Sequence, residues 1–443
     1  MIQPSALVFA ALLAHQASRL AQHGFGATRH TYAPVFGIRL PAPVTATAQL
    51  AALPAALAVT VFAPHPQTGL IALACVVLWL LTLQRRMANH VWMGFVAVAV
   101  LTFLPAALAP LFASDLLVGL YLSAAVFKMH GEYLTGPQSP GRVMTAIYLR
   151  LLGLPQPPAV LAAAPAAVIA AELAVPVLLL IPHGGAAALI VAILMHLAFG
   201  VSGNFEFSIV ALALWSIAAG DVDGVAVPSP ADPVWLLIPV CAAAGWLLGR
   251  SPSGPRAVPV QLRDAGQGAT YGFFCAFALA GSITDIPAPL GARLVHSAVT
   301  VGFVVNFLLV VSGLKLDWSF AMFSGLRPFG SSWLQRGSRA GQPRYFTLTL
   351  PDRIPSAWLR EVSPAFLYQA TRADQVVHEA VAFHLEAMAR RSGRSLEPRL
   401  VAARECDGVR QLMPVGGASV APRRRVLLFP GMVSRSFTTC HLG

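Results

Sequence analysis

The hydrophobic positions of this chain fall in long, nearly uninterrupted runs. Segments that cross a bilayer as helices need about 20 apolar residues, and backbone amides in lipid must be hydrogen-bonded within the segment. Residues 4–22 are apolar but carry His15, Gln16 and Arg19, so this segment is either an eleventh span or a surface helix. The predicted spans cover residues 46–63, 67–83, 90–110, 114–130, 158–181, 184–203, 205–219, 232–249, 270–290 and 294–314. The pattern predicts an all-α polytopic membrane helical bundle of about ten spans, within residues 1–314.

The pattern changes at residue 315, where charged positions become frequent and long apolar runs stop. Residues 345–350 (YFTLTL) and 425–430 (RVLLFP) predict strands. Residues 372–391 predict an amphipathic helix whose apolar face comprises Val377, Val381, Leu385 and Met388. We therefore expect a small extramembrane α+β domain over residues 315–443.

One connection between predicted spans, residues 140–153 (PGRVMTAIYLRLLG), alternates apolar and basic residues. This pattern is typical of a helix that lies along the membrane interface, although a plain connecting helix has the same pattern.

Composition supports a membrane protein. The 443 residues are 56% hydrophobic and only 11% charged, whereas about 25% charged is usual for a soluble domain. Basic residues in a membrane protein set its topology and meet anionic headgroups, so the formal charge of +12 predicts a lipid bilayer as partner and no nucleic acid. The five cysteines are scattered without a CxxC pair, and we expect neither a metal site nor a disulfide framework. The N-terminus lacks the pattern of a cleaved signal peptide.

The arginines before residue 315 are distributed unevenly between the two faces of the ten-span map. There are eleven of them, and all but Arg293 fall on one face. The positive-inside rule makes that face cytoplasmic. We therefore expect a multi-pass protein of the cell (inner) membrane, with its C-terminal domain in the cytoplasm and the loop around Asp221 and Asp223 outside.

Lysine is almost absent, which draws attention to Lys128. Of thirty basic residues only Lys128 and Lys315 are lysine, and Lys128 lies in the last turn of an apolar span, beside His130 and four residues before Glu132. A desolvated lysine can lose its proton, whereas an arginine in practice cannot. Lys128 is thus either a chemically active base or a lysine that snorkels from a span end.

Other polar residues fall at a similar membrane depth. Asn89 and His90 begin the third predicted span, while His196 and Asn204 lie near the end of the sixth and are followed by Glu206. Ionisable groups at membrane depth are costly and usually face a protein interior or a wet cavity. We therefore predict a polar pocket with His90, Lys128 and His196 as its catalytic residues. Residues that would bind a substrate or hold these three side chains in place are Asn89, His130, Glu132, Asn204 and Glu206.

At these residues the chain resembles a known family. The stretches RRMANHVWMGFVAVAVLTFLPA, GLYLSAAVFKMHGEYLTG, AELAVPVLLLIP and LMHLAFGVSGNFEFSIVALALW follow the order and spacing of the horizontally transferred transmembrane (HTTM) domain family, which includes the vitamin K-dependent γ-glutamyl carboxylases. The resemblance covers residues 70–220. Its Asn-His pair, lysine, acidic residue and later histidine match Asn89-His90, Lys128, Glu172 and His196.

The resemblance implies a chemistry for this pocket. Lys128 would be the base that deprotonates a hydroquinone cosubstrate such as vitamin K, and His90 would stabilise developing oxyanion charge. A small peptide would be the molecule that is modified. The chain departs from the carboxylases at Phe127, where they have a second lysine, and in the cytoplasmic face expected for Lys128, since their active site faces the lumen.

Three functions fit these observations. The first is an intramembrane, carboxylase-like enzyme that acts on a lipid-soluble cosubstrate. The second is a non-enzymatic membrane protein, such as a transporter or an export or immunity partner, that uses the same polar cluster. The third is a structural bundle in which polar residues only join helices. Repeated pairs of interrupted helices, typical of transporters, are not found in the sequence, which favours the enzyme.

Overall fold

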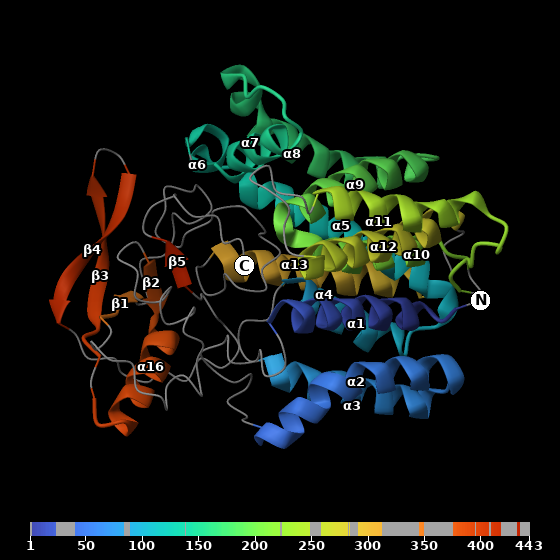
Figure 1. Ribbon diagram of the computed structural model, residues 1–443, viewed down its shortest axis with the longest axis horizontal. Coiled ribbons are helices and arrows are strands. Elements are labelled where there is room, and N and C mark those ends of the chain that lie inside the picture. Colours follow the sequence, from blue (N-terminus) through green and yellow to red (C-terminus); the bar gives the residue numbers. More distant parts are fainter. Residues whose placement is uncertain are drawn as a thin grey trace.

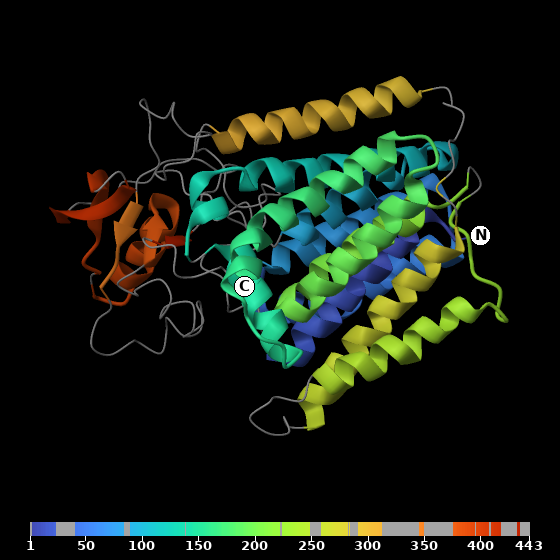
Figure 2. The same cartoon turned by 90° about the horizontal axis from the view of Figure 1, so that it is seen from above.

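The computed structural model describes residues 2–23, 40–83, 89–137, 139–221, 224–248, 258–281, 283, 291–311, 345–349, 375–394, 396–406, 409–417 and 432–434. Its larger part is a bundle of helices that run side by side, and a small sheet lies beyond one end of the bundle (Figure 1). In the view from above, the sheet again lies past the end of the helices (Figure 2). The predicted fold class, a helical bundle followed by a small α+β region, agrees with these elements.

The bundle contains long helices joined by short turns. In chain order they are α1 (Pro4–His23), α2 (Ala42–Phe62), α3 (Pro66–Leu83), α4 (Asn89–Leu101), α5 (Ala109–Lys128), α6 (Gly131–Thr135), α7 (Pro140–Leu151), α8 (Pro158–Leu180), α9 (Gly185–Phe199), α10 (Phe205–Ala218), α11 (Leu237–Leu248), α12 (Val258–Ala280) and α13 (Ala292–Val311). Short 3-10 turns precede α5 and α11, and a π-helical turn, Gly200–Asn204, joins α9 to α10.

Apolar length separates these helices into two groups. Within the described residues, four segments are long and apolar enough to cross a membrane: Pro43–Phe62, Ala106–Lys128, Pro158–Leu180 and Ala292–Val311. Five shorter apolar segments are Gln67–Leu83, Asn89–Leu101, Gly185–Phe199, Phe205–Ala218 and Pro233–Leu247. Large apolar side chains are exposed on the outside of the bundle, for example Leu180, Leu294 and Leu308. Lipid is the solvent that suits such a surface.

Helix α1 lies inside the bundle and is not a surface helix. It packs against α2, α4, α10 and α12, and Val8, Phe9 and Leu12 have no exposed surface. Its polar residues are buried as well, including His15 and Gln16. A helix on the membrane surface would leave one face in water or headgroups, which disagrees with the burial of α1. That residues 4–22 cross the membrane stays a prediction.

Two predicted helix boundaries were wrong. The predicted span 90–110 is interrupted, because α4 ends at Leu101, before Pro105, and α5 already begins at Ala109. Proline lacks the amide hydrogen that a continuing helix needs. The predicted span 270–290 instead forms α12 from Val258 to Ala280. The first half of α12 carries the polar residues Arg263, Asp264 and Gln267. It is therefore not an apolar run, and hydropathy does not predict it as part of a span.

Helices α11 and α12 form a close antiparallel pair through glycine. A Cβ atom at Gly268 would collide with the Cys241 carbonyl oxygen, and one at Gly272 would collide with that of Leu237. Residues four apart lie on one face of a helix, so these glycines let the two backbones touch.

The C-terminal strands form an antiparallel sheet with the order β4-β3-β1-β2-β5. The strands are β1 (Tyr345–Thr347), β2 (Gln375–His378), β3 (Arg399–Cys406), β4 (Val409–Gly417) and β5 (Met432–Ser434), and α16 (Glu379–Arg391) packs on β1 and β2. The strand predicted at 345–350 is confirmed over Tyr345–Thr347. The helix predicted at 372–391 was wrong in its first part, since residues 375–378 pair as β2. Residues 425–430 and Lys315 lie outside the described residues.

Candidate functional site

A buried ion pair joins α5 to α8. Lys128, in the last turn of α5, places Nζ 2.8 Å from Oε1 of Glu172 near the middle of α8. The two side chains are 1% and 3% exposed, so neither snorkels to a membrane surface. Lys128 Nζ also donates to the Ala124 carbonyl at 3.2 Å. The snorkelling interpretation of Lys128 is therefore wrong.

The surroundings of this pair are apolar. Ala125, Tyr133 and Ile169 form a buried cluster beside it, with Leu173 packed against them. Among the described residues, Oε2 of Glu172 has no hydrogen-bond partner. Removing two charges from water costs several kcal/mol per ion, which their attraction offsets only when the remaining polar atoms are also paired. Glu172 therefore retains one buried oxygen that can accept a hydrogen bond from a ligand.

A chain of hydrogen bonds leads to His196. The Trp215 indole N–H donates to the Tyr121 hydroxyl oxygen at 3.0 Å, and this oxygen lies 2.6 Å from Nε2 of His196. An indole nitrogen can only donate, so the arrangement that satisfies each group has Tyr121 donating to Nε2. The neutral His196 ring then carries its proton on Nδ1, which has no partner among the described residues.

The hydrogen bonds from Trp215 through Tyr121 to His196 lie near the ion pair. Tyr121 precedes Lys128 by seven residues, which places both side chains on one face of α5. Two unpaired buried groups, an acceptor on Glu172 and a donor on His196, thus belong to neighbouring helices, since α8 and α9 pack together.

His90 belongs to a different group of residues. Its Nε2 lies 3.0 Å from Nδ1 of His15, and the two rings meet edge to face with centroids 4.8 Å apart. Trp79 packs against His15 and donates to Gln16 Oε1 at 3.1 Å. Asn89, beside His90, has a buried side-chain oxygen without a partner in the described part of the chain.

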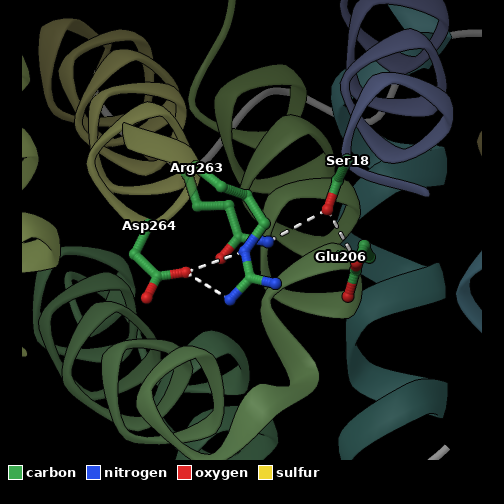
Figure 3. Close-up of polar contacts among 5 residues, drawn as sticks. Ser18, Glu206, Arg263 and Asp264 are labelled. Carbon is green, nitrogen blue, oxygen red and sulfur yellow. Dashed lines mark hydrogen bonds and ion pairs between the residues drawn. The ribbon is translucent and has the colours of Figure 1, made fainter. Parts of the chain in front are cut away.

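Glu206 takes part in a third network, which joins α1, α10 and α12. Ser18 Oγ donates to Glu206 Oε1 and accepts from Gln267 Nε2, each at 2.9 Å (Figure 3). On α12, Arg263 pairs with Asp264 at 2.6 Å. The network holds the buried α1 against its neighbours, and Glu206 is engaged with Ser18 there.

The remaining predicted residues have local roles. The His130 ring accepts from the Tyr133 amide at 3.4 Å, and the Glu132 side chain lies outside the described residues. Asn204 ends the π-helical turn, after which α10 folds back so that Ser208 Oγ donates to the His196 carbonyl at 2.9 Å. Among the described residues no group of three His, Cys, Asp or Glu could hold a metal ion.

The structure brings Lys128 and Glu172 together and gives His90 and His196 other partners. The convergence of His90, Lys128 and His196 on one pocket stays a prediction. Sequence reasoning missed three partners: His15, Tyr121 and Trp215. Helical spacing could have indicated Tyr121, which is two turns from Lys128, but the partners from α1 and α10 depend on tertiary packing.

Comparison with protein-family models, with curated proteins and with solved structures finds no match to this chain.

Proposed function

We propose that this protein is a multi-pass intramembrane enzyme in which Lys128 and Glu172 form an acid–base pair acting on a lipid-soluble substrate. The observation that supports this proposal is the buried 2.8 Å pair with its one unpaired carboxylate oxygen. A pair serving only to join helices would be satisfied by hydrogen bonds within the bundle.

The pair supplies a base as follows. Lys128 Nζ and Glu172 Oε1 share a hydrogen bond, and transfer of one proton along it leaves a neutral amine and a neutral carboxylic acid. A site of low polarity disfavours the charged forms, which makes this transfer accessible. The amine lone pair then accepts a proton from an acidic O–H of the substrate. Glu172 Oε2 can hold that hydroxyl before transfer.

The resemblance to the HTTM family directs the choice of substrate. It favours a quinol cosubstrate, such as vitamin K hydroquinone, and a small peptide as the molecule that is modified. A quinol has an apolar body suited to the bundle and a hydroxyl suited to Glu172.

Oxygen consumption tests this proposal. The purified chain in a neutral detergent is supplied with vitamin K hydroquinone or reduced menaquinone in air, and the protein-free rate is subtracted. We expect protein-dependent uptake that is lost in Lys128→Arg and in Lys128→Ala, because guanidinium keeps its proton and alanine has none to exchange. Arg150→Gln, at an exposed position of α7, is the control. Full uptake in a folded Lys128→Arg variant would contradict Lys128 as the base.

A second function is supported by the His15–His90 pair. Two imidazole rings whose nitrogens lie 3.0 Å apart can pass a proton between them. This pair lies on α1 and α4, whereas Lys128 and Glu172 lie on α5 and α8. A proton-coupled transporter would use protonatable groups distributed in this way. Proton flux into liposomes that is lost in His15→Gln while quinol oxidation is absent would favour this alternative.

A further inference from the structure

The first turn of α7 carries two buried polar atoms without a partner. Ser139 precedes the helix as its N-cap and is fully buried, yet its hydroxyl makes no capping hydrogen bond. Both Ser139 Oγ and Arg142 Nε lack hydrogen-bond partners among the described residues. A serine at this position normally accepts from an amide of the first turn, so its unpaired state is unusual.

These two atoms belong to one face of the helix. Residues three apart are neighbours on a helix surface, so Arg142 can reach back over the N-cap. The amides of a first turn have no partner inside their helix, and because Pro140 has no amide hydrogen, the free amides of α7 are those of Gly141 and Arg142. The helix dipole makes this end positive. Close packing fixes the position, because a Cβ at Gly141 would lie 2.9 Å from Cα of Pro165 on α8.

We propose that the first turn of α7 binds an oxyanion, a phosphate or carboxylate group, held by Ser139 Oγ, the Arg142 guanidinium and the free amides. All of these groups donate hydrogen bonds, and two of them carry positive charge or positive helix potential. A cation or an apolar ligand would leave the donors unpaired. The inference does not depend on the chemistry proposed for Lys128.

The position suggests how such a group arrives. Helix α7 follows α5 after the short α6, so the site lies near the end of α5 that carries Lys128. In Figure 1 α6 and α7 lie together beside one end of α8. An anionic lipid headgroup and a soluble phosphate share the required chemistry, and the experiment below distinguishes these two sources.

Thermal unfolding of the delipidated full chain in neutral detergent measures binding. Two probes are titrated: inorganic phosphate against chloride at equal ionic strength, and phosphatidylglycerol against phosphatidylcholine in mixed micelles. We expect a saturable rise in Tm with at least one probe. Arg142→Gln should weaken the apparent affinity on the order of 10- to 100-fold, because a charge-assisted hydrogen bond is lost. Arg150→Gln, which removes the same charge from an exposed position of α7, should leave it unchanged.

Ser139→Ala keeps the test informative if Arg142→Gln fails to fold. Its hydroxyl has no partner in the described chain, so without a probe the variant should unfold at the wild-type temperature or above it. With the probe its affinity should fall roughly threefold to tenfold. A response to phosphatidylglycerol alone assigns the site to a headgroup, and a response to phosphate assigns it to a soluble anion. No saturable shift with either probe, or equal shifts in wild type and both Ser139 and Arg142 variants, would overturn the proposal.

Discussion

At the residue scale, the central feature is a charged pair in a place where charge is costly. Lys128 and Glu172 are 1% and 3% exposed, and Ala125 and Ile169, each three residues before one of them on the same helix, belong to a buried apolar cluster. Such a pair is weak evidence for stability, because well-packed apolar residues of similar volume often stabilise as much or more. We therefore expect the pair to serve the chemistry of the site and not the stability of the bundle. A comparison of single and double variants can separate these two contributions.

Lys128→Met and Glu172→Leu should each destabilise the bundle by about 3–5 kcal/mol, because each leaves one buried charge without its partner. The double variant Lys128→Met/Glu172→Leu should recover most of that loss while remaining inactive in quinol oxidation. Equilibrium unfolding in detergent micelles measures the three variants against wild type. A double variant as unstable as the sum of the singles would show that the two residues contribute to stability independently, and would contradict a coupled buried pair.

The hydrogen-bond chain to His196 gives a second prediction. Tyr121→Phe removes the hydroxyl that serves both Trp215 and His196, so two buried groups lose their partner and stability should fall by about 1–3 kcal/mol. Tyr148→Phe is the matched control, since its hydroxyl is half-buried and donates to the Ala198 carbonyl at 2.6 Å. Unfolding midpoints that are equal for the two variants would contradict a special role for Tyr121.

Individual polar residues were predictable from the sequence, and their pairings were not. Lys128 is marked in the sequence because lysine is scarce and because it lies in an apolar run, whereas only the resemblance to a family indicated Glu172. His90 was grouped with Lys128 because they share a membrane depth. Depth does not specify which helices are neighbours, and the buried α1 brings His15 to His90 instead.

At the element scale, helix contacts depend on where small residues fall. The α11–α12 pair is held by glycines at 245, 268 and 272, each of which faces a backbone carbonyl of the other helix. Without a hydrophobic driving force between helices in lipid, close backbone packing supplies the association energy. The predicted span 270–290 missed the first half of α12 because hydropathy does not register this packing or the polar residues that accompany it.

Substitutions at two glycines of α12 test this packing. Gly268→Ala should destabilise the protein by about 1–3 kcal/mol, because its Cβ would displace the Cys241 carbonyl. Gly266→Ala is the control on the same helix, where an added Cβ meets nothing within 4 Å. It should stabilise by about 0.5–1 kcal/mol through a better helix propensity. The reverse order of unfolding midpoints would contradict the close approach of α11 and α12.

At the scale of the whole molecule, the ends of the bundle differ in charge and in connections. Ile2 pairs with Val225 beside the loop that follows α10, so the N-terminus lies at that end. Arg19 is near the other end of α1, where Ser18 meets Glu206 at the start of α10. A membrane-crossing α1 would leave the arginine-rich face where the sequence map put it, because α1 and α10 run in opposite directions.

The final prediction concerns orientation. We expect the 221–225 loop to lie outside the cell and the connection between α7 and α8 to lie in the cytoplasm. The reason is that the arginines gather at the end of the bundle that holds the α7–α8 connection. In a cysteine-free background, Asp223→Cys should react with a membrane-impermeant maleimide in intact cells. Gln156→Cys, at an exposed position before α8, should react only after the membrane is permeabilised. Both sites lie in connections between helices, so both cysteines should react once the cells are permeabilised. Each variant is therefore the control for the other. Labelling of Gln156→Cys in intact cells together with protection of Asp223→Cys would reverse the orientation and move Lys128 toward the outer leaflet, the side on which the carboxylases hold their active site.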